Sequence, residues 1–270
     1  MMMLDEIASI GNSPVGDKCV LFEEKIKRFV TSEFVRGNYR EKLDPDGYIR
    51  VSSIPYMCPR DEVWYALTDE LQYKEKERLR ITFDFGKAFE GIIRDNYLAP
   101  MEILKGDWEC AKCGYVVQSE EEKLIKPYYG CPSCNAIRWK YHESELVNEQ
   151  YKITGHCDGI VELDGNDYVL EIKSCNAYFF KLFKNDAYSC SFFSKYLIQI
   201  QMYMWLSGIH NGIFLFFNKD SSTMYSLPVS YSESIVDDVL KFVSDIRHCI
   251  RNSILPECTC KKQDHVDLKL

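Results

Sequence analysis

The segment at residues 151–175, YKITGHCDGIVELDGNDYVLEIKSC, constrains the fold of this chain more than any other feature. Its two halves are rich in β-branched and aromatic residues in partly alternating order, which predicts strands. The sequence DGND at 164–167 lies between them and is typical of a tight turn, so the segment is predicted to form a β-hairpin. Such a hairpin brings Asp158, at the end of one strand, close to Glu171 on the next.

The charges on the second strand carry a chemical signal. Glu171 and Lys173 are two residues apart, so on a strand they project from one face, while Tyr168, Leu170 and Ile172 project from the other, towards the core. Two neighbouring carboxylates repel each other unless a cation joins them. Mg²⁺ prefers hard oxygen ligands, and it can activate a bound water and neutralise charge on a phosphate. The alternative interpretation is a hairpin with ordinary surface charges.

The remaining patterns predict an α/β protein with a mixed central sheet flanked by helices. A second hairpin is predicted from GIFLFFNKD and STMYSLPVS, which follow the first hairpin. Helical patterns cover five stretches, at residues 20–36, after Pro59, at 83–98, at about 193–207 and at about 232–251.

Three sequence patterns together resemble a known enzyme superfamily. The order G-x-x-D, hairpin, E-x-K resembles motifs II and III of the PD-(D/E)XK nucleases, in the branch of lambda-type exonucleases and RecB-like nucleases. GKAFEGIIRDNY resembles the preceding helix of the lambda-type enzymes, in which a Gly is followed four residues later by a metal-binding Glu; here these are Gly86 and Glu90. Many RecB-like members have His at that position, and this chain departs from them. QIQMYMWLSG resembles their Q-x-x-x-Y helix.

The resemblance implies a restriction-endonuclease-like core that hydrolyses DNA with Mg²⁺ or Mn²⁺. It implies that Glu90, Asp158 and Glu171 ligate the metal ion through their side chains and Ile172 through its carbonyl. Lys173 is implied to position or activate the attacking water.

The helix after the hairpin supplies two more candidate residues. Gln199 and Tyr203 are four residues apart and share a helix face. Gln201 lies about 200° round the helix from Gln199, so we assign the family glutamine to Gln199, which would contact substrate phosphate or brace the lysine. For Tyr203, packing in the core is an equal alternative to a role in the site.

Four of the twelve cysteines form two CxxC pairs. Cys110 and Cys113 are separated from Cys131 and Cys134 by seventeen residues, which is the spacing of a tetrahedral zinc site. We therefore predict a zinc ribbon inserted ahead of the nuclease core. So short an insert buries little core, so the metal would supply most of its stability.

A second cysteine set has two interpretations. MCPRDEVWY around Cys58 resembles the first cysteine segment of RecB-like nucleases that carry a [4Fe–4S] cluster, including CRISPR-associated adaptation nucleases. The other ligands would be Cys249, Cys258 and Cys260, although their spacing departs from the usual pattern. Alternatively, Cys58 is a packed residue and the other three are incidental.

The predicted organisation has four parts: an N-terminal helical part at 1–105, the zinc ribbon at 106–141, the nuclease core at 142–256 and a tail at 257–270. The chain has no apolar run long enough to span a membrane, and its start lacks the features of a signal peptide, so we expect a cytoplasmic protein. The formal net charge of −8 argues against a protein that coats nucleic acid non-specifically, but a nuclease can contact DNA through a local basic patch.

The expected function is an exonuclease or end-processing enzyme of DNA recombination, replication or repair. A structure- or sequence-specific endonuclease, and a catalytically silent DNA- or protein-binding module on the same fold, stay open as alternatives. DNA is the expected partner. A homo-oligomer, such as the rings of lambda-type relatives, and a replication or recombination protein are left open by the sequence.

Overall fold

The computed structural model describes residues 25, 42–68, 77–117, 126–143 and 145–258. It separates into two compact units, one formed by Met1–Glu41 and Glu70–Phe85 and the other by Lys42–Asp69 and Gly86–Leu270. Apart from residue 25, the helix predicted at 20–36 lies outside the described residues. All that follows on the sheets and the candidate site concerns the second unit.

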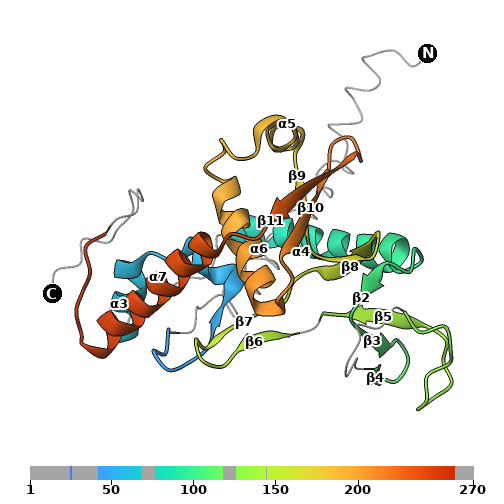
Figure 1. Ribbon diagram of the computed structural model, residues 1–270, viewed down its shortest axis with the longest axis horizontal. Helices are drawn as coiled ribbons and strands as arrows, with labels where there is room; N and C mark the ends of the chain where they lie inside the picture. The colour runs from blue at the N-terminus through green and yellow to red at the C-terminus, as the bar shows by residue number, and fades with distance from the viewer. Residues whose placement is uncertain (1–24, 26–41, 69–76, 118–125, 144, 259–270) are drawn as a thin grey trace. The chain divides into compact units, whose positions relative to one another are not determined.

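A five-stranded mixed sheet forms the centre of this unit, in the order β11-β10-β9-β8-β2 (Figure 1). The strands β9 and β10 pair in parallel, and the other neighbours pair antiparallel. This arrangement, flanked by helices, confirms the predicted α/β class. The five strands are β2 (Leu104–Lys105), β8 (Gly159–Leu163), β9 (Asn166–Cys175), β10 (Asn211–Asn218) and β11 (Met224–Ser230).

The hairpin of β8 and β9 has the tight turn that its sequence predicts. Leu163 pairs with Asn166, so only Asp164 and Gly165 form the loop. Both have positive φ angles, 51° and 75°, which a two-residue turn matched to the twist of the strands requires and which Asp-Gly adopts readily. The turn fixes the register of β8 against β9, and hence which side chains of the two strands are neighbours.

The single strand predicted before this turn is two strands in the structure. The chain leaves the strand β7 (Ile153–Gly155) at His156 and starts β8 only at Gly159. β7 belongs to a second sheet, β1-β7-β6, in which β1 (Ile49–Arg50) pairs with it in parallel and β6 (Leu146–Asn148) antiparallel. Asp158 therefore lies in the break between two sheets, a position that only long-range pairing defines.

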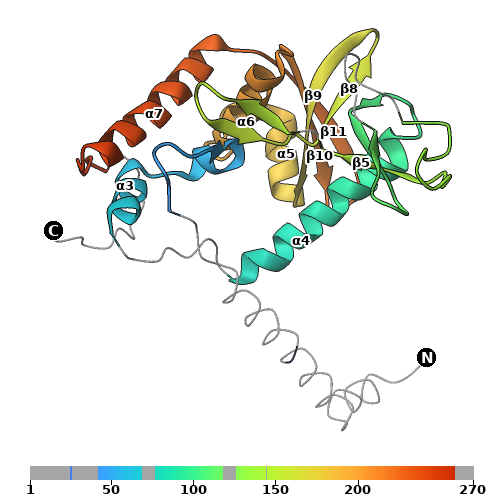
Figure 2. The same cartoon turned by 90° about the horizontal axis from the view of Figure 1, so that it is seen from below.

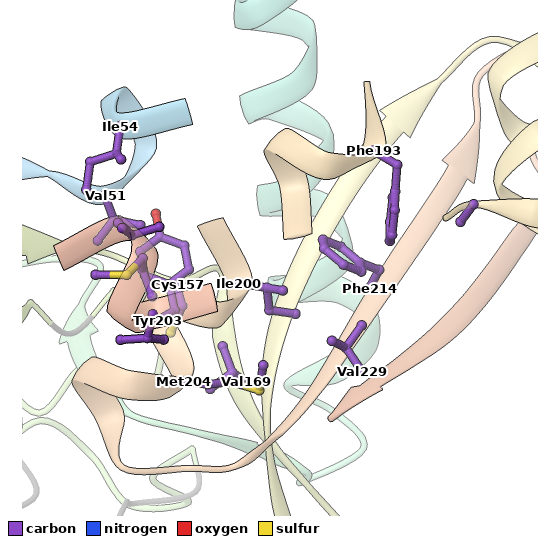
Figure 3. Close-up of a cluster of buried hydrophobic side chains, with 14 of the residues drawn as sticks. Val51, Ile54, Cys157, Val169, Phe193, Ile200, Tyr203, Met204, Phe214 and Val229 are labelled. Atoms are coloured by element: carbon purple, nitrogen blue, oxygen red, sulfur yellow. The ribbon is translucent and has the colours of Figure 1, made fainter. Parts of the chain in front are cut away.

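Helices cover the central sheet on the side of Val169. These are α5 (Ala177–Asp186), which we did not predict, and α6 (Phe193–Ser207), whose bounds agree with the predicted helix at about 193–207. Phe193, Ile200 and Met204 of α6 pack in one buried cluster with Val169 and Phe214 of the sheet (Figure 3). The 3₁₀ helix η1 (Val51–Tyr56) adds Val51 and Ile54 to the same cluster.

A second buried cluster covers the other face. Leu170 and Ile172 of β9 pack there with Ile93, which begins the π-helix η2 (Ile93–Leu98). This helix continues α4 (Glu77–Ile92), so the predicted helix 83–98 extends further at its start. Of the apolar side chains in this part of the chain, Ile93 is buried whereas Ile92 and Tyr97 are exposed.

A small sheet, β4-β3-β5, shares this second cluster through Trp108 and Trp139. Its strands are β3 (Asp107–Cys110), β4 (Val116–Val117) and β5 (Trp139–His142). Figure 1 shows it beside the β2 edge of the central sheet. We call residues 107–142 that the structure describes, with both CxxC pairs, the four-cysteine module.

Two helices form a third, smaller cluster. Val63 of α3 (Pro59–Leu67) packs against Ile246 and Ile250 of α7 (Glu233–Arg251), and Figures 1 and 2 show the two helices side by side. No helix among the described residues is long and apolar enough to cross a lipid bilayer.

Candidate active site

The structure brings the predicted hairpin residues together where β8 begins, beside the middle of β9. The backbone N–H of Ile172 donates to Asp158 Oδ2 at 2.6 Å, which ties the residue before β8 to the middle of β9. The Lys173 ammonium donates to Glu171 Oε1 and forms an ion pair with it. Asp158, Glu171 and Lys173 therefore form one cluster, as the hairpin predicted.

The face of β9 that carries Glu171 is not a solvent face. We expected only the face of Leu170 and Ile172 to adjoin the core, but helices cover the opposite face as well, and Glu171 is 1% exposed. An alternating pattern cannot distinguish a solvent face from a buried face that carries charges. The interpretation of Glu171 and Lys173 as ordinary surface charges is thereby wrong.

Burial of several carboxylates gives the cluster unusual proton affinities. Burial, assisted by Asp158, raises the pKa of Glu171 to about 8 against the opposing charge of Lys173. Burial, together with Asp158, also raises the pKa of Glu90 to about 7. Burial alone would lower the pKa of Lys173, but the charges of Glu171 and Asp158 raise it above its ordinary value. Lys173 is thus a cation among carboxylates that are reluctant to ionise.

The donor set fits a hard divalent cation. Glu90, Asp158 and Glu171 offer carboxylate oxygens, which Mg²⁺ and Mn²⁺ prefer. Glu171 Oε2 is buried and has no hydrogen-bond partner among the described residues, so it has an unfilled acceptor in a place where water is scarce. A cation bound there would satisfy this oxygen and reduce the repulsion between the carboxylates.

The two glutamines of α6 have different surroundings. Gln199 Nε2 donates to Tyr203 Oη at 3.1 Å, and Tyr203 itself is 2% exposed and part of the core cluster. Gln201 donates to the Ser230 carbonyl at 2.9 Å and accepts from the Ser232 N–H at 2.8 Å. Gln201 therefore joins α6 to the segment after β11, while Gln199 stays the candidate for the family glutamine.

Sequence reasoning missed Arg94, which the structure places against Asp158. Its guanidinium forms an ion pair with Glu143 and lies 4.0 Å from Asp158 Oδ1. Arg94 follows Glu90 by four residues, so the shared helix face was a signal that could have found it. Glu143 carried no comparable signal.

Tyr56, Lys195 and Tyr196 lie near Lys173 and are absent from the site predicted from the sequence. The Lys173 ammonium lies 5.2 Å from the centre of the Tyr196 ring, and the Lys195 ammonium lies 4.4 Å from the centre of the Tyr56 ring. Such distances suit cation–π attraction. Tyr56 is 46% exposed, so these cations and rings form a partly open rim beside Lys173.

The four CxxC cysteines converge within the four-cysteine module. The sulfur atoms of Cys110 and Cys134 are 3.6 Å apart, as are those of Cys113 and Cys131, and all four lie within 4.8 Å of one another. A tetrahedral ion with metal–sulfur bonds of about 2.3 Å would hold its sulfurs about 3.8 Å apart. The cluster therefore has the dimensions of a four-thiolate metal site.

The backbone of this cluster has two similar turns. Gly114 N–H donates to the Cys110 carbonyl at 3.0 Å, and Asn135 N–H donates to the Cys131 carbonyl at 2.8 Å. Gly114 and Asn135 both have positive φ, 73° and 57°, the conformation that these two residue types tolerate best. Each CxxC pair thus closes in a tight turn that directs both sulfurs to one point.

Of Cys58, Cys249, Cys258 and Cys260, two lie close together in the structure. The sulfurs of Cys58 and Cys258 are 3.8 Å apart. Cys249 packs against the cluster of α3 and α7, and Cys58 lies directly before α3. Cys260 lies outside the described residues. Among the other cysteines, Cys157 and Cys175 are buried and Cys190 is partly buried.

The solved structures that resemble the chain include two of an exonuclease. The crystal structure of LHK-Exo in complex with dAMP matches with 13% identity and a TM-score of 0.47, covering 78% of this chain and 91% of that chain. The crystal structure of an alkaline exonuclease (LHK-Exo) from Laribacter hongkongensis matches with 14% identity and a TM-score of 0.45, covering 77% and 90%. Likenesses this distant say nothing about activity.

Comparison with known sequences is more informative. No curated protein sequence matches the chain. The family model described as the YqaJ-like viral recombinase domain matches residues 51–210, which is more than half of the 270 residues and includes every carboxylate of the candidate site. The chain therefore belongs to the family of YqaJ-like viral recombinase domains.

Proposed function

We propose that this protein is a Mg²⁺- or Mn²⁺-dependent DNA nuclease of the PD-(D/E)XK type, acting as an exonuclease or end-processing enzyme in DNA recombination, replication or repair. The observation that carries the proposal is the cluster of Asp158, Glu171 and Lys173, in which a buried carboxylate oxygen lacks a partner among the described residues. Membership of a viral recombinase family supports DNA as the substrate.

In this proposal Glu90, Asp158, Glu171 and the Ile172 carbonyl hold the ion. The bound ion supplies Lewis acidity towards water and the scissile phosphate. Asp158 is held in place by the Ile172 N–H, so its carboxylate needs little reorganisation to bind the cation. Glu171 accepts from Lys173 with one oxygen and keeps the other for the ion.

Lys173 acts in this account as a fixed cation. The carboxylates around it raise its pKa, so it donates hydrogen bonds to the attacking water or to a phosphate oxygen and holds its proton. In this proposal Gln199, which donates to Tyr203, contacts substrate phosphate or braces Lys173 from α6. Tyr203 is buried enough that its role is to support Gln199 and the core.

Cleavage of linear and circular DNA tests the proposal. An exonuclease degrades only the linear form with Mg²⁺, whereas an endonuclease cuts both. Ca²⁺ should support binding without cleavage, because its larger and looser coordination shell positions water poorly. Asp158→Asn and Lys173→Met should each lower the rate about 10³-fold, as expected for residues that act as a unit.

Matched controls are available in the same part of the chain. Asp164→Asn changes an exposed acid in the β8–β9 turn, and Lys181→Met changes an exposed lysine on α5. Both should cut at the wild-type rate. If folded Asp158→Asn and Lys173→Met also cut at the wild-type rate, the site is wrong; if no variant and no wild-type protein cuts DNA, the binding-module alternative replaces the nuclease.

We also propose that the four-cysteine module binds one zinc ion through Cys110, Cys113, Cys131 and Cys134. Four sulfurs at tetrahedral separations, each CxxC pair in a tight turn, support this assignment. Burial would raise the pKa of the Cys110 thiol, but the N–H groups of Lys112 and Cys113 lower it to about 6. The Ala136 N–H would lower the pKa of Cys134, but burial and contacts with the neighbouring thiols raise it to about 12, so zinc binding would release protons from the cluster.

The [4Fe–4S] cluster stays a prediction. The 3.8 Å separation of Cys58 and Cys258 is compatible with two ligands of one site, and Cys249 belongs to the same part of the fold. Iron analysis of protein purified without oxygen decides it, and iron-free protein would leave the packing interpretation.

A further inference from the structure

Arg94 lies between the four-cysteine module and the carboxylate cluster. It is the second residue of η2, whose wider π-helical turn is closed by the Ala99 N–H donating to the Arg94 carbonyl at 2.8 Å. Its side chain is 13% exposed, so its charge depends on protein partners more than on water. These partners come from two different parts of the fold.

On one side Arg94 contacts the end of β5. Its guanidinium forms the ion pair with Glu143, directly after that strand, and lies 5.8 Å from the centre of the Tyr141 ring. A second contact joins the same elements, because the Tyr141 N–H donates to Asp95 Oδ1 at 3.5 Å. The position of Arg94 is thus tied to β5.

The cluster of four cysteines in turn fixes β5. Cys110 pairs with Trp139 in the antiparallel register of β3 and β5, and Ala111 N–H donates to the Arg138 carbonyl at 2.9 Å. Cys110 and Trp139 are both buried in the cluster that also contains Ile172. An ion held by the four thiols would therefore keep β5 in register.

On its other side Arg94 contacts Asp158. It donates to the Asp158 carbonyl at 3.4 Å, and its guanidinium lies 4.0 Å from Oδ1. Asp158 lies in the break between β7 and β8, so sheet pairing does not hold its backbone. Its position rests on two contacts, Ile172 N–H to Oδ2 and Arg94 to the carbonyl and Oδ1.

We propose that Arg94 is a positioning residue that couples the four-cysteine module to the carboxylate metal site: Glu143 holds Arg94, and Arg94 holds Asp158 where it can bind the cation. The identity of that cation rests on the proposed function. Partners of metal ligands commonly change metal affinity about 10–100-fold when they are removed. The four-cysteine module is then a support for catalysis as well as a folded insert.

The test measures Mn²⁺ affinity by electron paramagnetic resonance, without DNA, on full-length protein whose zinc content has been checked. The variants are Glu143→Gln, Arg94→Lys and the double variant. Glu149→Gln is the matched control, because it removes the exposed ion pair between Glu149 and Lys152 at 2.9 Å. Melting temperatures show whether each variant is folded.

Glu143→Gln and Arg94→Lys should each weaken Mn²⁺ binding about tenfold, while Glu149→Gln leaves it unchanged. The double variant should be no worse than Arg94→Lys alone, because Glu143 acts through Arg94. A merely structural role would lower the melting temperature and leave Mn²⁺ affinity unchanged. The Glu143 side chain is 37% exposed, so Glu143→Gln should fold even if Arg94→Lys does not. In that case the Mn²⁺ affinity of Glu143→Gln tests the inference by itself.

Equal Mn²⁺ affinity in wild type and folded Glu143→Gln would overturn the inference. It would also be overturned if the loss of Mn²⁺ affinity in the double variant equalled the sum of the two single losses in free energy. Its failure is distinguishable from failure of the proposed function. If the wild-type protein cuts DNA and Glu143→Gln binds Mn²⁺ normally, only the positioning role of Arg94 is wrong. If Mn²⁺ binding depends on Arg94 but the wild-type protein cuts no DNA, only the proposed nuclease activity is wrong.

Discussion

The four-cysteine module and the carboxylate cluster are two candidate metal sites built in opposite ways. The first uses four identical soft ligands from two short turns, and its sulfurs already lie within 4.8 Å of one another. The second draws on Glu90 of α4, Asp158 before β8 and Glu171 of β9, whose charges act on one another and on Lys173. It leaves one buried oxygen without a partner among the described residues. A closed set of protein ligands suits a structural ion, and an incomplete set suits an ion that also binds water or substrate.

The comparison predicts that the four-cysteine module depends on its ion for stability. Cys131→Ser removes a fully buried ligand, so the protein should lose its zinc and be destabilised by roughly 3 kcal/mol, which lowers the melting temperature by about 6–12 °C. Metal analysis and thermal unfolding measure both effects. Cys190→Ser, at a partly buried cysteine outside the module, is the control and should keep its zinc.

If Cys131→Ser keeps all of its zinc, the four cysteines are not the ligands of that ion. The contrast drawn between the two metal sites would then be wrong. Zinc loss with an unchanged melting temperature would instead show that the ion does not hold the small sheet together, and the coupling of β5 to Arg94 would lose its basis.

The carboxylate cluster should bind its ion in a strongly pH-dependent manner. Glu90 and Glu171, with pKa values raised to about 7 and about 8, still carry protons at pH 6 that a cation must displace. Because both values lie above the ordinary carboxyl range, Mn²⁺ affinity should rise by at least about tenfold from pH 6 to pH 8.5. Titrations with Mn²⁺ across this range measure it.

Glu171→Gln sharpens this prediction. It should bind Mn²⁺ more weakly and with a shallower pH dependence, since one of the two protons is no longer displaced. Zinc content should stay constant over the same range, because the four-cysteine module contains none of these carboxylates. A Mn²⁺ affinity that does not change with pH would show that the carboxylates are ionised without the metal.

The sequence predicted the locally determined parts of this molecule well. The Asp-Gly turn of β8 and β9, the bounds of α6 and the two CxxC turns follow from neighbouring residues alone. These signals suffice to place Asp158, Glu171 and Lys173 near one another, and to bring Cys110, Cys113, Cys131 and Cys134 together.

The rest depends on contacts between distant segments. The break that frees Asp158 arises because β7 pairs with β1, about a hundred residues earlier in the chain. The burial of Glu171 arises because α6 covers a strand face that its alternation marks as polar. Arg94 and Glu143 meet across 49 positions, and no periodicity in the sequence links them. The predicted domain boundaries stay predictions, as do the roles of the site residues.

The central claim is that the cation of the carboxylate cluster contacts the scissile phosphate, and a metal-rescue measurement tests it most directly. Linear DNA carrying one phosphorothioate linkage at the cleaved position is digested with Mg²⁺ and then with Mn²⁺, which binds sulfur better. We expect one phosphorothioate isomer to be cut at least about tenfold more slowly than normal DNA with Mg²⁺, and Mn²⁺ to restore most of the rate. Equal slowing with both ions, or cleavage that continues after all divalent metal is removed, would contradict the account.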